Sequence, residues 1–281
     1  MAKLREKPFL TPNDKGLVGT DDAVSIQNAI DAAHANGINK VVIPRYNKRT
    51  DTALWSIGAT IRIPADMMLV LDSCRLELAE GFTGRMFSNS LSDAEEGKLI
   101  AGEQINIRIL GKGEAVLAGN GEMIYLHNVR NFTVDGLRVE DSAGNAICLM
   151  YCAYGKVSNI EFAGDCTAAD QNGIVIRCAC HDVTVENITG VVGNHVVSVI
   201  VEASEALEVP AHVMGVVVDT RNLIIKNIKA TCSGSLVKLF NQDARMLYNV
   251  LIEAIEDTSP DYAENRPFSA VMIGDTDAKA N

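Results

Sequence analysis

The sequence predicts a single right-handed parallel β-helix, an all-β fold in which one chain winds into stacked coils of short strands. Three observations indicate it: a short repeated motif, an apolar composition that is aliphatic rather than aromatic, and many turn residues. The motif is a pair of apolar residues with two residues between them, and it recurs at intervals of 23, 28, 40 and 27 residues. Its five copies are Val134/Leu137, Val157/Ile160, Val185/Ile188, Ile225/Ile228 and Ile252/Ile255. Self-similarity at intervals of this size is typical of solenoid proteins.

The composition and the small size of the repeat both favour stacked strands. Hydrophobic residues make up 47% of the chain and aromatic residues only 5%, so the apolar content is mostly Val, Ile, Leu and Ala, which suits strands. Each unit is too small to bury its own apolar face, whereas coils whose strands lie about 4.8 Å apart bury it in a continuous inner column. In three copies Asn precedes the second apolar residue, at Asn159, Asn187 and Asn227. Because Asn tolerates the left-handed conformation, we expect these residues at bends.

Residues 20–37, TDDAVSIQNAIDAAHANG, predict a helix ahead of the first coil. Thr20 or Asp21 is expected to cap its start, a helix-cap role explains the pair Asp21-Asp22, and Gly37 ends it. The strand 40–44 follows, and the helix should cover the open end of the stack, as terminal caps do in repeat proteins. We therefore divide the single domain into an arm, cap helix and first strand (1–45) and a series of coils (46–281).

The other end of the chain shows no comparable cap. The stretch SAVMIGDTDAKAN (269–281) ends soon after an apolar run. A coil left open there exposes unpaired strand edges. We therefore expect the last coil to associate with another chain, in a homo- or hetero-oligomer.

Charge and cysteine content exclude several classes of partner. The net charge of −11 argues against nucleic acid or an anionic membrane, since both require a basic surface. No apolar run approaches the roughly 20 residues that span a bilayer, and the N-terminus does not resemble a secretory signal. The seven cysteines do not have the spacing of a metal site, so we expect reduced, buried thiols, no metal or cofactor, and a cytoplasmic protein.

Two stretches resemble a known family. DDAVSIQNAIDAAHANGINKVVIP (21–44) resembles the opening of β-helices of the pectate-lyase superfamily. NGIVIRCACHDVTVENITGVVGNHVVSV (172–199) resembles the active-site coils of bacterial family 28 glycoside hydrolases, the polygalacturonase-like group. The resemblance implies a pectate lyase-like parallel β-helix and a carbohydrate substrate or ligand.

The resemblance breaks down at the catalytic carboxylates. The group's first catalytic aspartate corresponds to Asn172, and its paired aspartates correspond to Asn194 and His195. Inverting hydrolysis needs a carboxylic acid and a carboxylate about 6.5–9.5 Å apart, and Asn cannot exchange a proton at neutral pH. Losing general acid–base catalysis costs on the order of 10²–10⁴ in rate. By the same resemblance, His181 matches a histidine of the group, which is either structural or functional, and Lys238 matches a basic substrate-binding residue.

Two hypotheses of different classes follow. The first is a glycoside hydrolase with rearranged acid–base residues, in which His195 and the loop carboxylates Asp170 and Asp165 are catalytic. Histidine, with an ordinary pKa of about 6.5, is the best local proton carrier. The second is a catalytically inactive glycan-binding protein, or a non-catalytic subunit. In either case the expected substrate-binding residues are Asn172, Asn194, Arg177, His181 and Lys238.

Each hypothesis predicts a different arrangement. Asn172 and Asn194 are 22 residues apart, close to one coil, so they should lie side by side at equivalent corners, about 5 Å apart. As corner residues they would be held in backbone turns, whereas in a binding site they would contact a sugar. A hydrolase requires Asp165 or Asp170 within reach of His195. Trp55 could stack on a sugar ring, but packing under a loop explains it equally simply.

Overall fold

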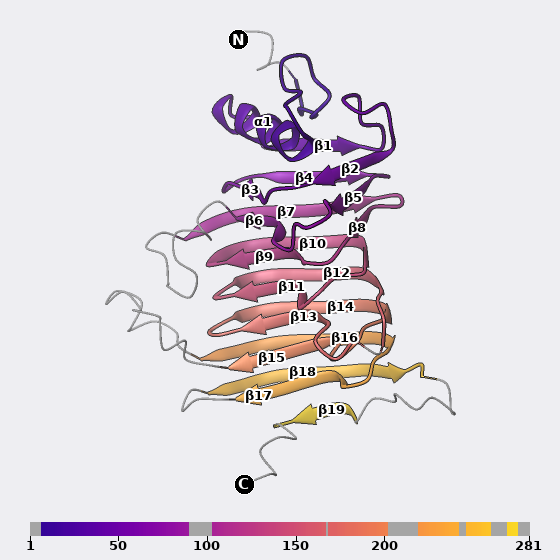
Figure 1. Ribbon diagram of the computed structural model, residues 1–281. Coiled ribbons are helices and arrows are strands. Elements are labelled where there is room, and N and C mark those ends of the chain that lie inside the picture. The colour runs from indigo at the N-terminus through magenta and orange to yellow at the C-terminus, as the bar shows by residue number, and fades with distance from the viewer. Residues whose placement is uncertain are drawn as a thin grey trace.

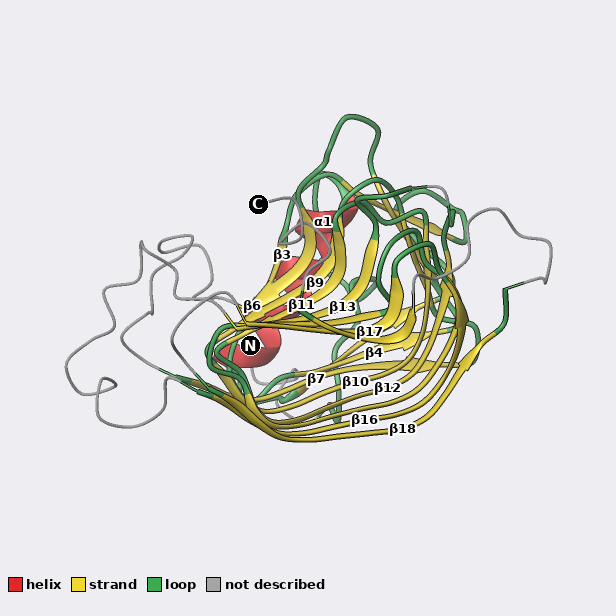
Figure 2. Cartoon of the chain, turned by 90° about the horizontal axis from the view of Figure 1, so that it is seen from below, coloured by secondary structure: helices red, strands yellow, loops and turns green. Residues whose placement is uncertain are grey.

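The computed structural model describes residues 7–89, 103–166, 168–201, 219–241, 246–259 and 269–274, and these form a right-handed parallel β-helix (Figure 1). Viewed along the stack, two sheets enclose the interior (Figure 2). We call the sheet that contains β1, β4, β7, β10, β12, β14, β16 and β18, with β2, β5 and β8 beside this path, sheet 1. Sheet 2 contains β3, β6, β9, β11, β13, β15, β17 and β19. The strands pair in parallel within both sheets.

From β9 on, successive strands alternate between the two sheets, whereas the first three coils each place two consecutive strands in sheet 1 before one in sheet 2. The bounds in sheet 1 are β1 (Lys40–Pro44), β2 (Leu54–Ile57), β4 (Met68–Asp72), β5 (Arg75–Leu78), β7 (Gln104–Lys112), β8 (Val116–Ala118), β10 (Val129–Glu140), β12 (Ala153–Ala163), β14 (His181–Val191), β16 (Thr220–Thr231) and β18 (Leu247–Asp257). The bounds in sheet 2 are β3 (Ile61–Ile63), β6 (Arg85–Asn89), β9 (Glu122–His127), β11 (Asn145–Met150), β13 (Asn172–Arg177), β15 (Val197–Val201), β17 (Ser235–Asn241) and β19 (Ser269–Ile273).

The repeated motif sets the register of sheet 1. Val134 pairs with Val157, which pairs with Val185, and the same column continues through the next two strands. The second apolar position forms a parallel column that begins at Leu137 and Ile160. In β10, β12, β14 and β16 these side chains are at most 2% exposed. The predicted inner stack is therefore confirmed, and the fold follows from burying one apolar column per motif position.

Asparagine side chains form hydrogen-bonded ladders along the bends. Asn159, Asn187 and Asn227 have φ values of 53°, 57° and 54°, which confirms their prediction as left-handed bend residues. Each donates its Nδ2 to the side-chain oxygen one coil earlier, and the first acceptor is Asp135. Two further ladders have the same form, Asp66–Asn106–Asn131 and Asp182–Asn222–Asn249.

Ala254 ends one ladder and is expected to be improved by asparagine. It lies in the register position after Asn227, has φ 54° and is exposed. Ala254→Asn should raise the free energy of unfolding by about 1 kcal/mol, because Asn tolerates this conformation and can donate to Asn227. Urea unfolding measures the change. Ala254→Leu, which lacks the amide, is the control, and equal stability of the two variants would contradict the role of the ladder.

The helix α1 (Asp22–Ala35) covers the first coil (Figure 1). Asp21 is its N-cap, since its carboxylate accepts a hydrogen bond of 2.8 Å from the backbone N–H of Val24. The prediction that Asp22 shares this cap role is wrong. Asp22 is 1% exposed and accepts hydrogen bonds from Asn47 Nδ2, Arg49 Nε and the N–H of Ser56 at 2.7–2.8 Å. Asp22 therefore holds the loop between β1 and β2 against the helix α1.

Other sequence expectations are met in part. Trp55 is 1% exposed and donates to the carbonyl of Pro44 at 2.8 Å, so it packs under the arm rather than against a sugar. All seven thiols are reduced, and all but Cys166 are buried. Among the described residues, no helix has the length and apolar character to cross a bilayer. Ile273 of β19 is 83% exposed, while association through the last coil stays a prediction.

Candidate functional site

A row of polar side chains crosses sheet 2 where its strands begin, partly exposed in the first four coils and buried in the last two. We call it the entry row, and it consists of Arg85, Glu122, Asn145, Asn172, His195 and Ser235. The first four are aligned by strand pairing, Arg85 with Glu122 and Asn145 with Asn172. Each coil contributes one residue, so neighbours are separated by one strand spacing of about 4.8 Å.

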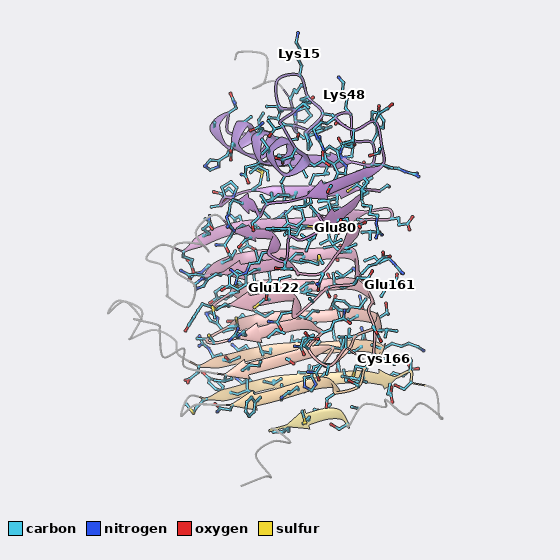
Figure 3. The ribbon with its side chains drawn as sticks, viewed as in Figure 1. Lys15, Lys48, Glu80, Glu122, Glu161 and Cys166 are labelled. Carbon is cyan, nitrogen blue, oxygen red and sulfur yellow. The ribbon has the colours of Figure 1, made fainter. Side chains whose placement is uncertain are left out.

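Hydrogen bonds connect the entry row from end to end. Arg85 Nε lies 2.8 Å from Glu122 Oε2, and Asn145 Nδ2 makes a long contact of 3.5 Å with Glu122 Oε1. Asn172 Nδ2 then donates to Asn145 Oδ1 at 3.3 Å. The side chains are therefore arranged in advance of any ligand. Glu122 is labelled in Figure 3, midway along the stack.

His195 continues the row and is held on both sides by neighbouring coils. Its backbone N–H faces Asn172 Oδ1 at 3.4 Å, and its Nδ1 accepts a 2.9 Å hydrogen bond from the N–H of Ser235. An Nδ1 that accepts cannot carry the proton, so this bond fixes the neutral ring with its proton on Nε2. The side chain is 7% exposed. His195 is thus a buried ring held in one orientation by its neighbours.

Gly234 makes this close approach possible. A Cβ at position 234 would lie 2.4 Å from Asn194 Oδ1 and 2.7 Å from His195 Nδ1. A side chain at position 234 would therefore displace the side chains of Asn194 and His195, so glycine serves here for close contact and not for its dihedral freedom.

The predicted pairing of Asn172 with Asn194 is wrong by one residue. Asn172 is level with His195, whereas Asn194 is level with Gln171, whose carbonyl accepts its N–H at 2.7 Å. The coil between the two matching positions is therefore 23 residues long, and the 22-residue spacing compares residues on different levels. Asn194 lies in the turn before β15, where its carbonyl accepts a hydrogen bond from Gly234 at 2.9 Å.

The loop with Asp165 and Asp170 is tied to the segment that precedes His195. Gln171, which is 6% exposed, accepts hydrogen bonds at Oε1 from the N–H groups of Asp165 and Gly193, both at 3.1 Å. Its Nε2 donates to the carbonyl of Ser142 at 2.6 Å. Both aspartates are exposed. Within the described part of the chain, no hydrogen bond or ion pair joins Asp170 to another side chain.

Three predicted binding residues lie away from the entry row. Arg177 is the last residue of β13, five positions beyond Asn172 and so roughly 16 Å along the strand. His181 begins β14 in sheet 1, where its Nδ1 contacts Asp182 Oδ2 at 2.7 Å. Lys238 pairs in register with Ser198, and its ammonium lies 5.1 Å from the ring centroid of Phe240. The structure therefore brings Asn172 and His195 together and leaves these three elsewhere.

Sequence reasoning missed Arg85, Glu122 and Asn145. They share no residue type, but each follows a glycine and precedes an apolar strand: GRMF, GEMI and GNAI, with GSLV at Ser235. Aligning the coils on this glycine would have found them. The motif used instead lies on sheet 1, which does not carry the row.

A buried cluster lies beside the row on the same sheet. Tyr125, Cys148, Met150 and Cys178 pack together with Tyr151, and the Arg85 guanidinium stacks 3.7 Å from the Tyr125 ring centroid. His127 is 1% exposed, and neither of its ring nitrogens has a hydrogen-bond partner in the described structure. Burial, together with the charge of Arg85, lowers the pKa of His127 to about 4. The cluster is therefore a rigid, apolar support for Arg85.

The described residues contain no group of three or more His, Cys, Asp or Glu side chains that could hold a metal ion. The chemistry available in the entry row is hydrogen bonding by two carboxamides, a neutral imidazole and a carboxylate paired with arginine. These groups suit a ligand rich in hydroxyls, since hydroxyls both donate and accept.

Comparison with solved structures shows the fold. A family 28 exopolygalacturonase from Yersinia enterocolitica has a TM-score of 0.64 at 14% identity, over 98% of this chain and 62% of that one. The tailspike protein of Escherichia coli bacteriophage HK620, a mutant in complex with a pentasaccharide, has a TM-score of 0.59 at 15% identity, over 95% and 56%. PfbA, a surface adhesin of Streptococcus pneumoniae, has a TM-score of 0.56 at 14% identity, over 94% and 78%.

These similarities define the class of protein: a right-handed parallel β-helix of the kind found in glycoside hydrolases, tailspikes and an adhesin. The chain spans about half to two-thirds of the length of the first of these relatives. No family model matches the sequence, and no curated protein matches it.

Proposed function

We propose that this protein binds a carbohydrate chain along the entry row without the paired-carboxylate hydrolysis of polygalacturonases. The observation that carries the proposal is the continuous row itself, one polar side chain per coil. A pyranose ring with its linking oxygen is close in length to one strand spacing, so consecutive sugars can meet consecutive coils. The pentasaccharide bound by the HK620 tailspike and the adhesin role of PfbA are consistent with ligand binding on this fold.

The side chains of the row favour binding over inverting hydrolysis. Asn145 and Asn172 supply no proton. Glu122, the carboxylate of the row, is engaged by Arg85 at 2.8 Å. Where the resemblance implies a first aspartate, Asn172 is instead part of a hydrogen-bonded chain. This arrangement fixes a ligand, and it lacks the separated acid and base that inversion requires.

One observation favours the hydrolase as a second candidate. The side chain of Gln171 contacts both Asp165 and Gly193 through the same oxygen, so the loop of the two aspartates is held against the segment that leads to His195. In this alternative, His195 must first take up a second proton at Nδ1, at the expense of the hydrogen bond from Ser235, and then donates a proton to the leaving oxygen while Asp165 or Asp170 activates water.

Replacing Asn172 by alanine is expected to weaken glycan binding roughly tenfold, because it removes one ligand hydrogen bond and breaks the row. Calorimetric titration with a panel of pectic, other anionic and neutral oligosaccharides measures the affinity. Asn227→Ala removes a comparable exposed carboxamide from a ladder of sheet 1 and should leave this affinity unchanged. Wild-type protein that binds nothing in the panel would contradict the proposal.

Incubating the same oligosaccharide panel with the wild-type protein and with the variants Asp170→Asn and His195→Ala separates the two functions. Binding without release of reducing ends supports the glycan-binding protein. Release that is lost in both Asp170→Asn and His195→Ala supports the hydrolase instead.

A further inference from the structure

A second groove lies on sheet 1, where β14, β16 and β18 begin. It has a volume of about 600 Å³ and is lined by Asp182, Thr184, Asn222, Ile224, Asn249 and Leu251, together with backbone of the adjacent residues. We call it the corner groove. Its strands belong to the sheet opposite the entry row (Figure 2), so it is a separate feature of the molecule.

The polar wall of the corner groove is a side-chain ladder. Asn249 Nδ2 donates to Asn222 Oδ1 at 3.1 Å, and Asn222 Nδ2 donates to Asp182 Oδ1 at 3.0 Å. Each ladder bond uses one N–H and one lone pair of a carboxamide, so each asparagine keeps a second N–H and a second lone pair. The wall therefore offers a donor and an acceptor once per strand, about every 4.8 Å.

The floor and one end of the groove are apolar. Ile224 and Leu251 are 37% and 49% exposed. Tyr154, on the adjoining strand β12, is 52% exposed and contacts the imidazole of His181 edge-on at 5.2 Å. That imidazole in turn bonds to Asp182. Tyr154 is not part of the groove lining, but it lies one strand beyond Asp182, with the Arg130 guanidinium 5.4 Å from its ring centroid. An aromatic ring thus lies beside the polar wall, a combination that suits a ligand with an apolar face and a hydroxylated edge.

Tyr154 has a backbone conformation that is unusual for an aromatic residue, and its ring packs against Arg130 and His181. It lies in the row between Asn131 and Asp182, in register with both, and has φ 53°. The same bend carries Asn or Asp in the neighbouring coils, because these residues tolerate the left-handed region, whereas a bulky aromatic there is strained. Tyr154 also interrupts a hydrogen-bonded ladder and gains little burial. Strain retained at an exposed aromatic residue indicates a function.

We propose that the corner groove is a second glycan-binding site, specific for a neutral oligosaccharide. One sugar ring lies on Tyr154, and the hydroxyls of the following sugars pair with Asn222 and Asn249. The per-strand spacing fits sugar rings better than an extended peptide, whose side chains on one face recur about every 6.6 Å. Ligands with carboxylates or sulfates are disfavoured by the charge of Asp182.

The charge at Asp182 is well defined. The hydrogen bond from His181, with a further one from Asn222, lowers the pKa of Asp182, so its carboxylate is ionised at neutral pH. This site goes beyond the function proposed for the entry row, and it does not require the entry row to bind anything.

Tyr154→Asn tests the proposal, because it removes the platform while supplying the residue that the bend prefers. The full-length variant should unfold at a temperature no lower than wild type, since the ladder can now run from Asn131 to Asp182. Its affinity for the best of four neutral tetrasaccharides, built of glucose, mannose, xylose or galactose units, should fall about five- to tenfold. Titration calorimetry and thermal unfolding measure the two quantities. Tyr46→Asn, at a tyrosine that is 51% exposed in the loop between β1 and β2, should leave the affinity unchanged.

Two more variants locate the binding. Leu251→Glu places a charge on the groove floor and should also weaken binding at least fivefold, whereas Asn227→Ala, on the same sheet but outside both the corner groove and the entry row, should preserve it. The proposal is overturned if wild-type protein binds none of the four tetrasaccharides, or if Tyr154→Asn binds as tightly as wild type. It is likewise overturned if binding is retained in Leu251→Glu, a result that would place the ligand outside the corner groove.

Discussion

Replacing Gly234 by alanine is expected to lower glycan affinity at the entry row at least tenfold while leaving the coils folded. The new Cβ would lie 2.7 Å from His195 Nδ1 and 2.4 Å from Asn194 Oδ1. These atoms are the ends of side chains, which can rotate away without moving the backbone. His195 must then give up its hydrogen bond from Ser235, and the proton of the neutral ring is no longer confined to Nε2.

The cost to stability should be moderate. Overpacking of this kind costs about 1–3 kcal/mol of unfolding free energy, and urea unfolding at neutral pH measures it. Gly58→Ala is the matched control, since its Cβ would meet only Ala79, at an ordinary 3.7 Å, and it should alter neither stability nor affinity. Undiminished glycan binding by Gly234→Ala would show that the orientation of His195 does not matter.

The second large effect is a loss of stability in acid caused by His127. Burial, with a contribution from Arg85, lowers the pKa of His127 from 6.5 to about 4 in the folded protein. As the pH falls below 6.5, the unfolded chain binds a proton at this residue before the folded one does. The stabilisation is complete above pH 6.5 and is lost progressively down to pH 4, about 3 kcal/mol in all.

His127→Leu isolates this term from the other groups that titrate in acid. Urea unfolding of wild type and variant at pH 7 and pH 4.5 should show that wild type loses about 2–3 kcal/mol more than the variant between the two values. The comparison uses the pH-dependent difference, so a constant change in packing cancels. The same loss in both proteins would mean that the imidazole is hydrated or hydrogen-bonded in solution.

The fold could be predicted from the sequence because it is built from one local rule. A coil returns the chain to a position one strand spacing away, so Val157 and Val185 recur in the sequence and lie side by side in space. The helix start at Asp21 was equally local. Asp22 was misjudged because its partners Asn47 and Arg49 are brought to it by the first loop.

The candidate site was only partly predictable, and the errors have physical causes. His195 and Asn172 were found through a resemblance. Their pairing was missed because the coil between them is 23 residues long, whereas the prediction paired Asn172 with Asn194, 22 residues on. Glu122 and Asn145 are joined by register and not by residue type, so only the preceding glycine marks them in the sequence. His127 was not foreseen, because alternation along a strand predicts that outward positions face water, and here an aromatic and sulfur cluster buries one.

The ladders also give the stack a direction. In each of them an aspartate comes first and every later amide donates back toward the N-terminus. A coil that carries asparagine at both bends, such as that of β16 with Asn222 and Asn227, donates back in two ladders, so a copy of it inserted in place would continue both. A coil that carries Asp135 or Asp182 accepts in that ladder but donates nothing, so a copy of it inserted downstream would interrupt the ladder. The stack can therefore be lengthened without breaking a ladder only by repeating coils whose two bends both carry asparagine.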